Sequence, residues 1–554
     1  MARTPLFQAL KNLVGEHTAA RKVNLPLQTW RELRLEAREQ RLGSESPDFS
    51  RRQFLALTGA LALGAAMPRF ARAADQPKVA IVGGGIAGLT CALMLADRGI
   101  KSTVYEASAR VGGRMFSNSS GYWDNRQTSE WGGEFIDSGH KTIRHLAKRF
   151  GLMLDDLSTA PPSGSEDTYH FLGNYYSQAQ ADRDFAAVVD ALQTDADAAG
   201  YPTTYDSFTA EGKVLDNMSV YAWIESRVPG GYTSLLGQLL DVAYTTEYGA
   251  DTQDQSALNL LYLLGFQPNA SALSIFGESD ERYRIRGGNE KLPRTMGRHL
   301  SDCIELSCAL QRIKQTSGGR YRLDFSNGST TQQIVADYVV LALPFAVLHS
   351  LNYELAGFDA LKQRAIQEQG RGHNSKLQLQ FRKRLWNQVG AWPGVSNGSS
   401  YTDTGYQSTW DATRKQGGTS GIINFYSAAN VTDSMQSTSA FAKANNALVV
   451  ADANRALTRS APVFPGLAEK WNGKATQSLP HKSRLYGASY SYYRVGQYTA
   501  FGGYEKAPQG RIFFCGEHTS TDFQGYMEGG ASEGKRVGQE LALLLKNYAK
   551  AAKA

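Results

Sequence analysis

Short apolar runs and longer amphipathic segments alternate along the chain from about residue 78 onward. Residues 78–82 form an apolar run followed by glycines, which is typical of a buried parallel strand. Residues 86–98 have the periodicity of a helix that stops at Gly99, and residues 102–105 predict a second strand. This order predicts a strand, helix and strand that belong to a parallel α/β sheet.

The same two patterns recur further along the chain. They predict helices at residues 220–227 and 256–264, and strands at residues 304–313, 321–325, 337–343 and 511–515. Alternation from Leu377 to Phe381 predicts a strand with one wet and one buried face, and Lys376 stands at its start. A lysine in that place is most often a solvated strand end. The aromatic residues between Tyr401 and Trp410 predict either the wall of a pocket or a packed core.

Three glycines directly after the first strand form a G-x-G-x-x-G pattern, at Gly83, Gly85 and Gly88. The first allows a tight turn, the second lets the backbone approach a pyrophosphate, and the third allows close packing of helix on strand. Glu106 follows the second strand, where a carboxylate can accept hydrogen bonds from ribose hydroxyls. Glycine triplets also occur in plain turns, but the flanking strand, helix and acid favour a dinucleotide bound at the helix N-terminus.

Two arginines indicate which dinucleotide is bound. Arg110 and Arg114 flank the pair Gly112-Gly113 just past the second strand, an arrangement suited to gripping more phosphate. An NAD site does not need this second set of phosphate contacts. The pattern resembles the flavin amine oxidase family, which includes monoamine oxidases, polyamine oxidases and L-amino-acid oxidases, and the resemblance implies FAD as the cofactor.

The resemblance covers the chain from about residue 75 and implies its fold. It implies an α/β protein, with a Rossmann-type (glutathione-reductase-like) FAD-binding domain and a discontinuous α+β substrate domain. The implied FAD-binding domain comprises residues 75–139, 284–345 and 485–554, and the substrate domain comprises residues 140–283 and 346–484.

The resemblance also implies which residues contact FAD, and most of them lie in glycine-rich turns. They are Gly83, Gly85, Ala87, Gly88, Glu106, Ala107, Arg110, Arg114, Gly132, Gly133, Glu134, Phe135, Leu310, Glu517, Gly525, Tyr526 and Met527. Mitochondrial monoamine oxidases keep a flavin-linked cysteine in the segment that corresponds to residues 487–490. Because Ala488 and Ser489 stand there, we expect non-covalent FAD.

Four residues are implied at the substrate. Lys376 matches a lysine that in relatives holds a water against flavin N5, and Tyr526 matches the aromatic residue before the flavin face, so both are expected to be catalytic. Phe135 stands where many L-amino-acid oxidases have an arginine that clamps the substrate carboxylate. Asp137 matches an acid that faces the substrate channel in some polyamine oxidases, although it could equally cap a turn or helix. An acid there would favour a basic side chain, as in lysine or arginine, or a diamine.

The implied reaction removes two electrons from a carbon that bears an amine. Hydride passes to flavin N5, the imine hydrolyses to a keto acid or aldehyde plus ammonia, and molecular oxygen is reduced to hydrogen peroxide. The substrate would be a small-molecule amine, and an L-amino acid is the first expectation. The alternatives are a monoamine or polyamine oxidase, a desaturase or decarboxylating monooxygenase, and an FAD-binding protein without turnover. Lys376 and Tyr526 argue against a desaturase.

The first 74 residues have a different character. Arg51-Arg52 precede an apolar run to Ala66 and the small-residue sequence Ala71-Arg72-Ala73, which matches a twin-arginine export signal. The apolar run of about a dozen residues is too short for a permanent membrane anchor, and the alternative is an ordinary buried helix. We therefore expect the twin-arginine translocation machinery as a partner and a periplasmic or secreted location. Residues 1–49 show no recognisable chemistry.

Composition mainly excludes other classes. Residues 1–74 contain 12 Lys and Arg against 6 Asp and Glu, which accounts for +6 of the formal net charge of +7. The pI of about 9.0 therefore does not indicate a nucleic-acid partner, and no basic patch with interleaved aromatics does so either. Four cysteines without C-x-x-C or Cys/His ligand spacing predict neither a disulfide framework nor a metal site. The sequence leaves a homodimer open.

Changing Arg51 and Arg52 together to lysine should leave active, FAD-loaded protein in the cytoplasm. A protein that folds around its cofactor before export depends on the paired arginines of its signal. Oxidase activity in periplasmic and cytoplasmic fractions measures the effect. Undiminished periplasmic activity in the double variant would exclude this route.

Overall fold

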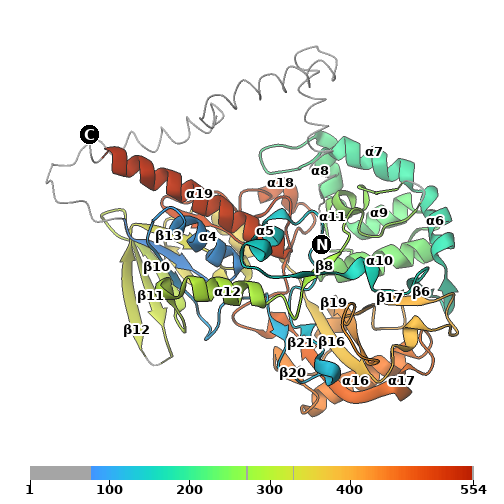
Figure 1. Cartoon of the computed structure of the whole chain (residues 1–554). Helices are drawn as coiled ribbons and strands as arrows, with labels where there is room; N and C mark the ends of the chain where they lie inside the picture. Colours follow the sequence, from blue (N-terminus) through green and yellow to red (C-terminus); the bar gives the residue numbers. More distant parts are fainter. Residues whose placement is uncertain (1–76, 270–271, 329, 552–554) are drawn as a thin grey trace, which may run out of the picture. The chain divides into compact units, whose positions relative to one another are not determined.

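A five-stranded parallel sheet carries the predicted nucleotide turn. The structure is a computed structural model that describes residues 77–269, 272–328 and 330–551, so the predicted export signal lies outside the described residues (Figure 1). The strand order is β23 (Ile512–Phe514), β13 (Tyr338–Leu341), β1 (Val79–Val82), β2 (Ser102–Tyr105) and β9 (Ile304–Glu305), with all neighbours parallel. Helix α4 (Ile86–Ala96) connects β1 to β2, which confirms the predicted strand, helix and strand.

Side chains of β1 alternate between two cores, as the period of two in a strand requires. Val79 and Ile81 pack in one cluster with helices α4, α5 (Lys141–Arg149), α12 (Lys291–His299) and α19 (Met527–Ala551). Ala80 and Val82 pack in a second cluster. That cluster includes an antiparallel layer made of β12 (Thr331–Ala336), β11 (Tyr321–Ser326) and β10 (Ala309–Gln315), together with β14 (Asn352–Leu355). Both faces of the parallel sheet are therefore covered, which confirms the α/β class.

The predicted single strand at residues 304–313 is wrong. The segment divides into β9, which joins the parallel sheet, and β10, which joins the antiparallel layer. Ser307 lies between them with φ of 57°, a left-handed conformation that breaks the strand. An apolar pattern cannot reveal this break, because the pattern does not report which sheet each half joins.

An eight-stranded sheet forms the second large layer. Its order is β20 (Phe441–Lys443), β21 (Trp471–Ser478), β16 (Asn374–Phe381), β19 (Gly421–Ala428), β18 (Ser408–Asp411), β17 (Ser396–Thr402), β6 (Glu166–Phe171) and β7 (Asn174–Tyr176). Helix α10 (Leu235–Tyr248) contacts β17 and β19, and helix α16 (Ala447–Ser460) contacts β16 and β21. All eight residues of β16 are buried, so the prediction that this strand has one wet face is wrong.

Helices fill the chain between β7 and β8 (Tyr283–Ile285). They are α6 (Gln178–Ala186), α7 (Val189–Ala199), α8 (Ala210–Asp216), α9 (Val220–Arg227), α10 and α11 (Ala257–Leu264), and the predictions at residues 220–227 and 256–264 are confirmed. Side-chain oxygens cap the first turns of five of them, at Ser177, Thr209, Ser219, Ser234 and Ser256. Serine and threonine at these places fix where the helices begin, because they accept from otherwise unpaired N–H groups.

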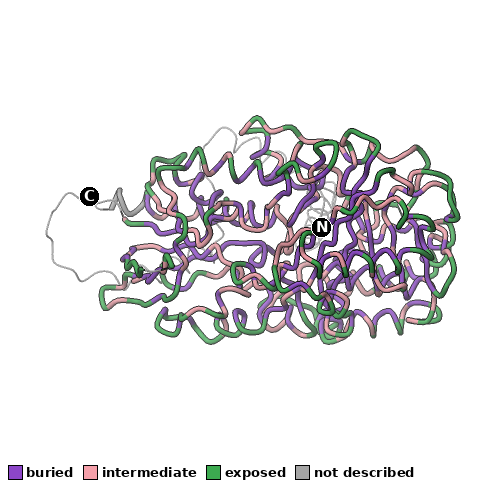
Figure 2. Tube along the Cα trace, turned by 90° about the horizontal axis from the view of Figure 1, so that it is seen from below, coloured by how far each residue is buried: buried purple, intermediate pink, exposed green. Residues whose placement is uncertain are grey.

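Shorter elements connect these layers. They are β3 (Ser117–Asn118), β4 (Ser129–Glu130), β5 (Leu154–Asp156), β15 (Gly370–Arg371), β22 (Ser491–Tyr492), α13 (Phe345–Leu348), α14 (Ala360–Glu368), α15 (Ala429–Asp433), α17 (Leu467–Lys470), α18 (Gln497–Phe501), and the 3-10 turns η1 (Asp124–Arg126), η2 (Leu157–Thr159), η3 (Gly231–Thr233), η4 (Ser301–Cys303), η5 (Leu385–Asn387), η6 (Pro480–Lys482) and η7 (Glu517–Thr519). Buried residues fill the interior and exposed residues follow the outer turns (Figure 2).

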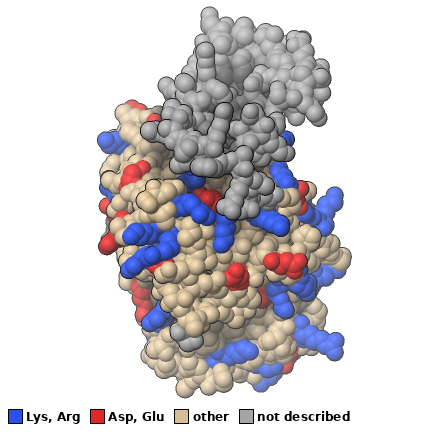
Figure 3. All heavy atoms as spheres, turned by 90° about the vertical axis from the view of Figure 1, so that its left-hand side faces the viewer, with Lys and Arg blue, Asp and Glu red and all other residues tan. Residues whose placement is uncertain are grey.

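Two surface properties bear on partners. On the face shown in Figure 3, lysine and arginine are interspersed with aspartate, glutamate and uncharged residues. No helix among the described residues has the length and apolar character needed to cross a bilayer.

Candidate active site

A cavity of about 640 Å³ begins at the carboxyl ends of the parallel strands and extends to the eight-stranded sheet. Loops after β1, β2, β13 and β23 line one end, and residues of β16, β17, β18 and β19 line the other. Its volume lies within the range of small-molecule sites. The position also agrees with the rule that ligands of open parallel sheets bind outside the carboxyl ends of the strands.

The glycine turn leaves room for a ligand at the first end. Gly83 has φ of +108°, and a Cβ on Gly88 would lie 1.9 Å from the carbonyl oxygen of Gly83, so both positions require glycine. Among residues 77–269, 272–328 and 330–551, no atom lies within 4 Å of the place a Cβ on Gly85 would occupy. Gly85 is also the N-cap of α4 and adds no side-chain hydrogen bond, which leaves the first N–H groups of the helix available to an anion.

Glu106 holds this turn together. Its carboxylate accepts hydrogen bonds from the N–H of Gly84 at 2.7 Å and from the N–H of Ser108 at 2.8 Å. The residue also lines the cavity, so the lone pairs that remain are placed for hydroxyl donors such as those of a ribose.

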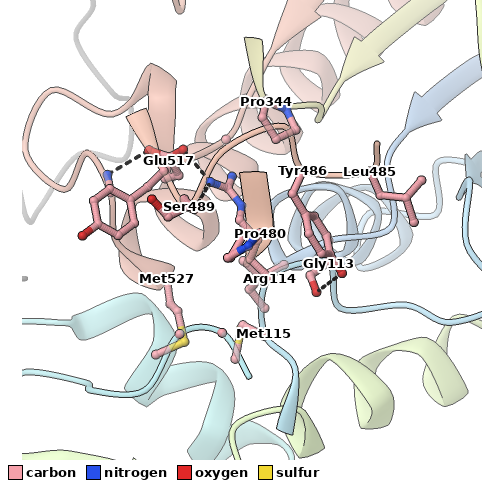
Figure 4. A pocket seen from close by; sticks show the side chains of 18 of the residues that line it. Gly113, Arg114, Met115, Pro344, Pro480, Leu485, Tyr486, Ser489, Glu517 and Met527 are labelled. Atoms are coloured by element: carbon pink, nitrogen blue, oxygen red, sulfur yellow. Dashed lines mark hydrogen bonds and ion pairs between the residues drawn. The ribbon is translucent and has the colours of Figure 1, made fainter. Parts of the chain in front are cut away.

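The two predicted arginines have different surroundings. Arg114 lines the cavity and pairs with Glu517 at 2.8 Å (Figure 4). Arg110 is not among the lining residues, because its guanidinium donates to the carbonyl of Gly113 at 2.7 Å and to the hydroxyl of Tyr486 at 2.8 Å. Arg110 therefore stabilises the turn at Gly112-Gly113 from outside the cavity.

Glu517 is buried and fully engaged. Besides Arg114, it accepts from the Ser491 hydroxyl at 2.8 Å and from the N–H of Gly525 at 2.9 Å. Burial opposes ionisation of this carboxyl, but Arg114, together with His518 and the Ser491 hydroxyl, outweighs it and keeps the Glu517 pKa below its ordinary value. The carboxylate thus fixes the loop before α19 against the strand β22.

The other residues expected near FAD line the same cavity, except Gly88, which packs behind the turn. The lining set includes Gly83, Gly85, Ala87, Ala107, Gly132, Gly133, Glu134, Phe135, Leu310, Gly525, Tyr526 and Met527. A Cβ on Gly132 would lie 1.9 Å from the carbonyl oxygen of Arg114, so the two backbone segments can lie this close together only with glycine at position 132. Ser489 also lines the cavity, and its hydroxyl donates to the carbonyl of Gly372 at 2.7 Å.

Lys376 is not a solvated strand end. It is the third residue of β16, 9% exposed, and its Nζ lies 2.7 Å from Glu134 Oε2. The other carboxylate oxygen of Glu134 is buried without a hydrogen-bond partner among the described residues, and lies 3.7 Å from an Arg284 nitrogen. Lys376 and Glu134 therefore form a buried ion pair in the cavity wall.

Asp137 is 1% exposed and lines the cavity, but it does not cap the following helix. Its carboxylate accepts from the Ser279 hydroxyl and from the N–H of Glu281, both at 3.1 Å. Burial raises the Asp137 pKa to about 7, and the neighbouring Glu281 adds to the effect.

Glu247, on the last turn of α10, is a cavity residue that the sequence reasoning missed. It is 5% exposed, and Tyr526 donates to its Oε1 at 3.3 Å, while Oε2 has no partner among the described residues. Burial raises the Glu247 pKa to about 8. One signal was present in the sequence, because an acid in the last turn of a helix opposes the helix dipole and needs another reason to be there.

Aromatic rings form the rest of this end. The aromatic residues that line the cavity are Phe135, Tyr401, Trp410, Tyr426, Tyr490 and Tyr526. Tyr406 belongs to a separate hydrophobic core. The segment from Tyr401 to Trp410 therefore contributes both to the wall of the pocket and to a packed core, the two alternatives that its sequence predicts. The hydroxyls of Tyr426 and Tyr490 lie 2.9 Å apart. Aromatic walls can accept an apolar chain, and the few buried carboxyl groups between them can pair with a positive charge at its end.

The model of the family described as flavin containing amine oxidoreductase matches residues 86–542. An L-amino-acid oxidase of Pseudechis australis is 23% identical over 85% of this chain and 88% of its own length. A flavin-containing amine oxidase of Danio rerio is also 23% identical, over 84% of this chain and 86% of its own length.

Solved structures share the fold. A cyclohexylamine oxidase from Brevibacterium oxydans matches with a TM-score of 0.71 at 20% identity, over 85% of this chain and all of its own. A putrescine oxidase solved with bound putrescine matches with a TM-score of 0.70 at 18% identity, over 84% of this chain and 99% of its own.

Proposed function

The chain belongs to the family of flavin-containing amine oxidoreductases, and from this premise we propose that it oxidises L-amino acids with a basic side chain. It is an FAD-dependent oxidoreductase. A diamine is the second candidate substrate, because Phe135 lines the cavity at the position where many L-amino-acid oxidases have an arginine that clamps the substrate carboxylate.

The residues present fit FAD. The turn at Gly83 and Gly85, the carboxylate of Glu106 and the guanidinium of Arg114 would hold its nucleotide and phosphates. When bound, FAD supplies at N5 the acceptor for the hydride that leaves the amine-bearing carbon, and passes the electrons to oxygen as hydrogen peroxide.

The protein's own residues would choose and orient the substrate. The reacting amine must be neutral when hydride leaves, and the rings of Tyr426, Tyr490 and Trp410 disfavour an ammonium ion by removing it from water. Lys376 is placed to hold a water or polar substrate atom, since its ammonium has two further N–H donors beyond the contact with Glu134.

Oε2 of Glu247, which has no hydrogen-bond partner in the part of the chain that the structure describes, carries the proposal of a basic substrate. A buried carboxylate oxygen without a donor is unfavourable, and a guanidinium or ammonium ion at this place would satisfy it. Asp137 and Glu281 also line the cavity and add two further carboxyl groups, whose pKa burial raises to about 7. Asp137 is the weaker candidate for direct contact, because its oxygens already accept from Ser279 and Glu281.

We further propose non-covalent FAD, separate FAD-binding and substrate domains with the boundaries given above, and export by the twin-arginine route. Support for the first comes from Ala488 and Ser489, which offer no thiol at the segment beside the cavity.

Peroxide release over a panel of amines and amino acids tests the function. We expect arginine, lysine or a terminal diamine to give more peroxide than leucine or a simple monoamine, because a cationic side chain pairs with the buried carboxyl of Glu247 as that carboxyl ionises. Ammonia release with a keto acid product would identify the amino-acid reaction. Peroxide from none of them would favour a protein without amine oxidase turnover.

Glu247→Gln should lower the ratio of kcat/KM for arginine to that for leucine by about tenfold to hundredfold, the range for one charged hydrogen bond. The wild-type ratio should rise with pH through about 8, as the carboxyl of Glu247 ionises, and this rise should disappear in the variant. The α-amino group titrates in both substrates and cancels in the ratio.

Asp137→Asn is the matched comparison for that experiment, since it neutralises a second buried acid of the same wall. We expect a smaller loss than for Glu247→Gln. A wild-type ratio below one, or a ratio that neither variant changes, would remove the acids from the argument and leave a general amine oxidase.

Lys376→Met should slow flavin reduction or reoxidation by orders of magnitude while the protein still purifies yellow. The reason is the loss of the only charged N–H donor that β16 places in the described cavity wall. Stopped-flow absorbance measures both half-reactions.

Lys474→Met is the control for Lys376, because Lys474 lies on the neighbouring strand β21, pairs with Asp124 of η1 and does not line the cavity. The double variant Glu134→Gln with Lys376→Met removes both charges of the ion pair. Its comparison with Lys376→Met separates the effect of losing the ammonium from the effect of leaving the Glu134 carboxylate unpaired. Near-normal rates in both Lys376 variants would assign the ion pair a structural purpose only.

A further inference from the structure

A cluster of two histidines and one aspartate lies outside the cavity. His373 precedes β16, Asp433 ends α15, and His481 lies in η6. One ring nitrogen from each histidine and one carboxylate oxygen of Asp433 all lie within 4.8 Å of one another. None of the three is needed for the reaction proposed above, so the cluster requires its own explanation.

The contacts inside the cluster leave ligand atoms available. His373 Nδ1 lies 2.9 Å from Asp433 Oδ1, and the rings of His373 and His481 stack with centroids 4.6 Å apart and 19° between their planes. Nδ1 of His481 is buried and has no hydrogen-bond partner among the described residues. A buried ring nitrogen without a hydrogen-bond partner among the described residues, a second imidazole and a carboxylate together form a set of metal donors.

We propose that His373, Asp433 and His481 bind a divalent transition-metal ion of the Zn²⁺ class. Imidazole and carboxylate suit Zn²⁺, which takes three protein ligands and leaves a fourth position to water in open sites. Tetrahedral bonds of about 2.0–2.2 Å place ligand atoms about 3.4 Å apart. Donors that lie up to 4.8 Å apart must therefore approach by about 1.4 Å, and the stacked rings must turn so that a nitrogen of each points at the ion.

The surroundings permit such a closure. His373 and His481 are half-buried and Asp433 is exposed, so an ion can enter from solvent and the carboxylate can turn toward it. The neighbouring ammonium of Lys482 is directed elsewhere, since it donates to the carbonyls of Met435 and Ser437 at 3.1 and 2.7 Å. It therefore does not occupy the place of the cation.

The site would join three segments that are distant in sequence. The carbonyl of His373 accepts from Ala429 at 3.0 Å and its N–H donates to Gly249 at 2.8 Å, so the His373 backbone is already fixed beside β16. Pro480, next to His481, lines the cavity. Because the ion would bind the folded chain and not the unfolded one, it should raise the thermal stability of the protein.

Calorimetric titration of the chelator-treated, FAD-loaded enzyme with ZnCl₂ tests the site. We expect a single Zn²⁺ per chain and a melting temperature that rises with Zn²⁺ concentration. His481→Gln and Asp433→Asn should each weaken binding by more than the about tenfold to hundredfold that loss of an outer-shell partner costs. Flavin absorbance checks that each variant is folded.

His145→Gln is the matched control, because His145 is an exposed histidine on α5 outside the cluster. It should bind Zn²⁺ and gain stability as the wild type does. Wild-type enzyme that binds no Zn²⁺, or binding that neither His481→Gln nor Asp433→Asn weakens, would overturn the proposal and leave a stacked histidine pair with a hydrogen bond to aspartate.

Discussion

The buried carboxylate of Glu517 is the contact on which the cofactor end of the cavity depends. It joins Arg114 after β2, Ser491 on β22 and Gly525 before α19, three segments that are far apart in sequence. A carboxylate in this environment is stable as an anion only while its partners surround it, and loss of one leaves a buried charge uncompensated. Electrostatics therefore fixes the separation of these loops, and the apolar clusters on both faces of the parallel sheet hold the strands from which they emerge.

The sequence predicts elements well where local rules decide. The glycine turn with β1, α4 and β2 is specified within 30 residues, and serine caps mark the beginnings of α9 and α11. Prediction from the sequence fails where the element that packs against a segment determines the burial of that segment or the sheet that it joins. β16 looks half-solvated by alternation, yet α16 packs on the face of Leu377, Leu379 and Phe381. The opposite face, with Lys376, Gln378 and Gln380, is hydrogen-bonded to the segment 124–134. β9 and β10 look continuous, yet each pairs with a different sheet.

The site divides in the same way. Residues in contiguous motifs, such as Glu106 and the Gly132-Gly133 pair, reach the cavity as expected. The ion pair of Lys376 with Glu134 joins residues 242 positions apart, and no spacing rule connects them. The tertiary fold alone brings Glu247 into the cavity and places His373 beside His481. The sequence signals for them are weak: Glu247 is an acid at a helix C-terminus, where it opposes the helix dipole, and the histidines stand singly beside loops.

Buried acids give the cavity its character through linkage of protonation to folding and binding. Burial raises the pKa of Glu247 to about 8 and that of Asp137 to about 7, whereas both ionise near their ordinary values in the unfolded chain. Between the ordinary pKa of a carboxyl and these raised values, the folded chain thus binds more protons than the unfolded chain. Its free energy of unfolding therefore falls as the pH rises through this window. A cationic side chain in the cavity favours the ionised carboxylates and lowers their pKa. The acids that destabilise the free protein at neutral to alkaline pH therefore stabilise its complex with a positively charged substrate, and selectivity for positive charge follows from their burial.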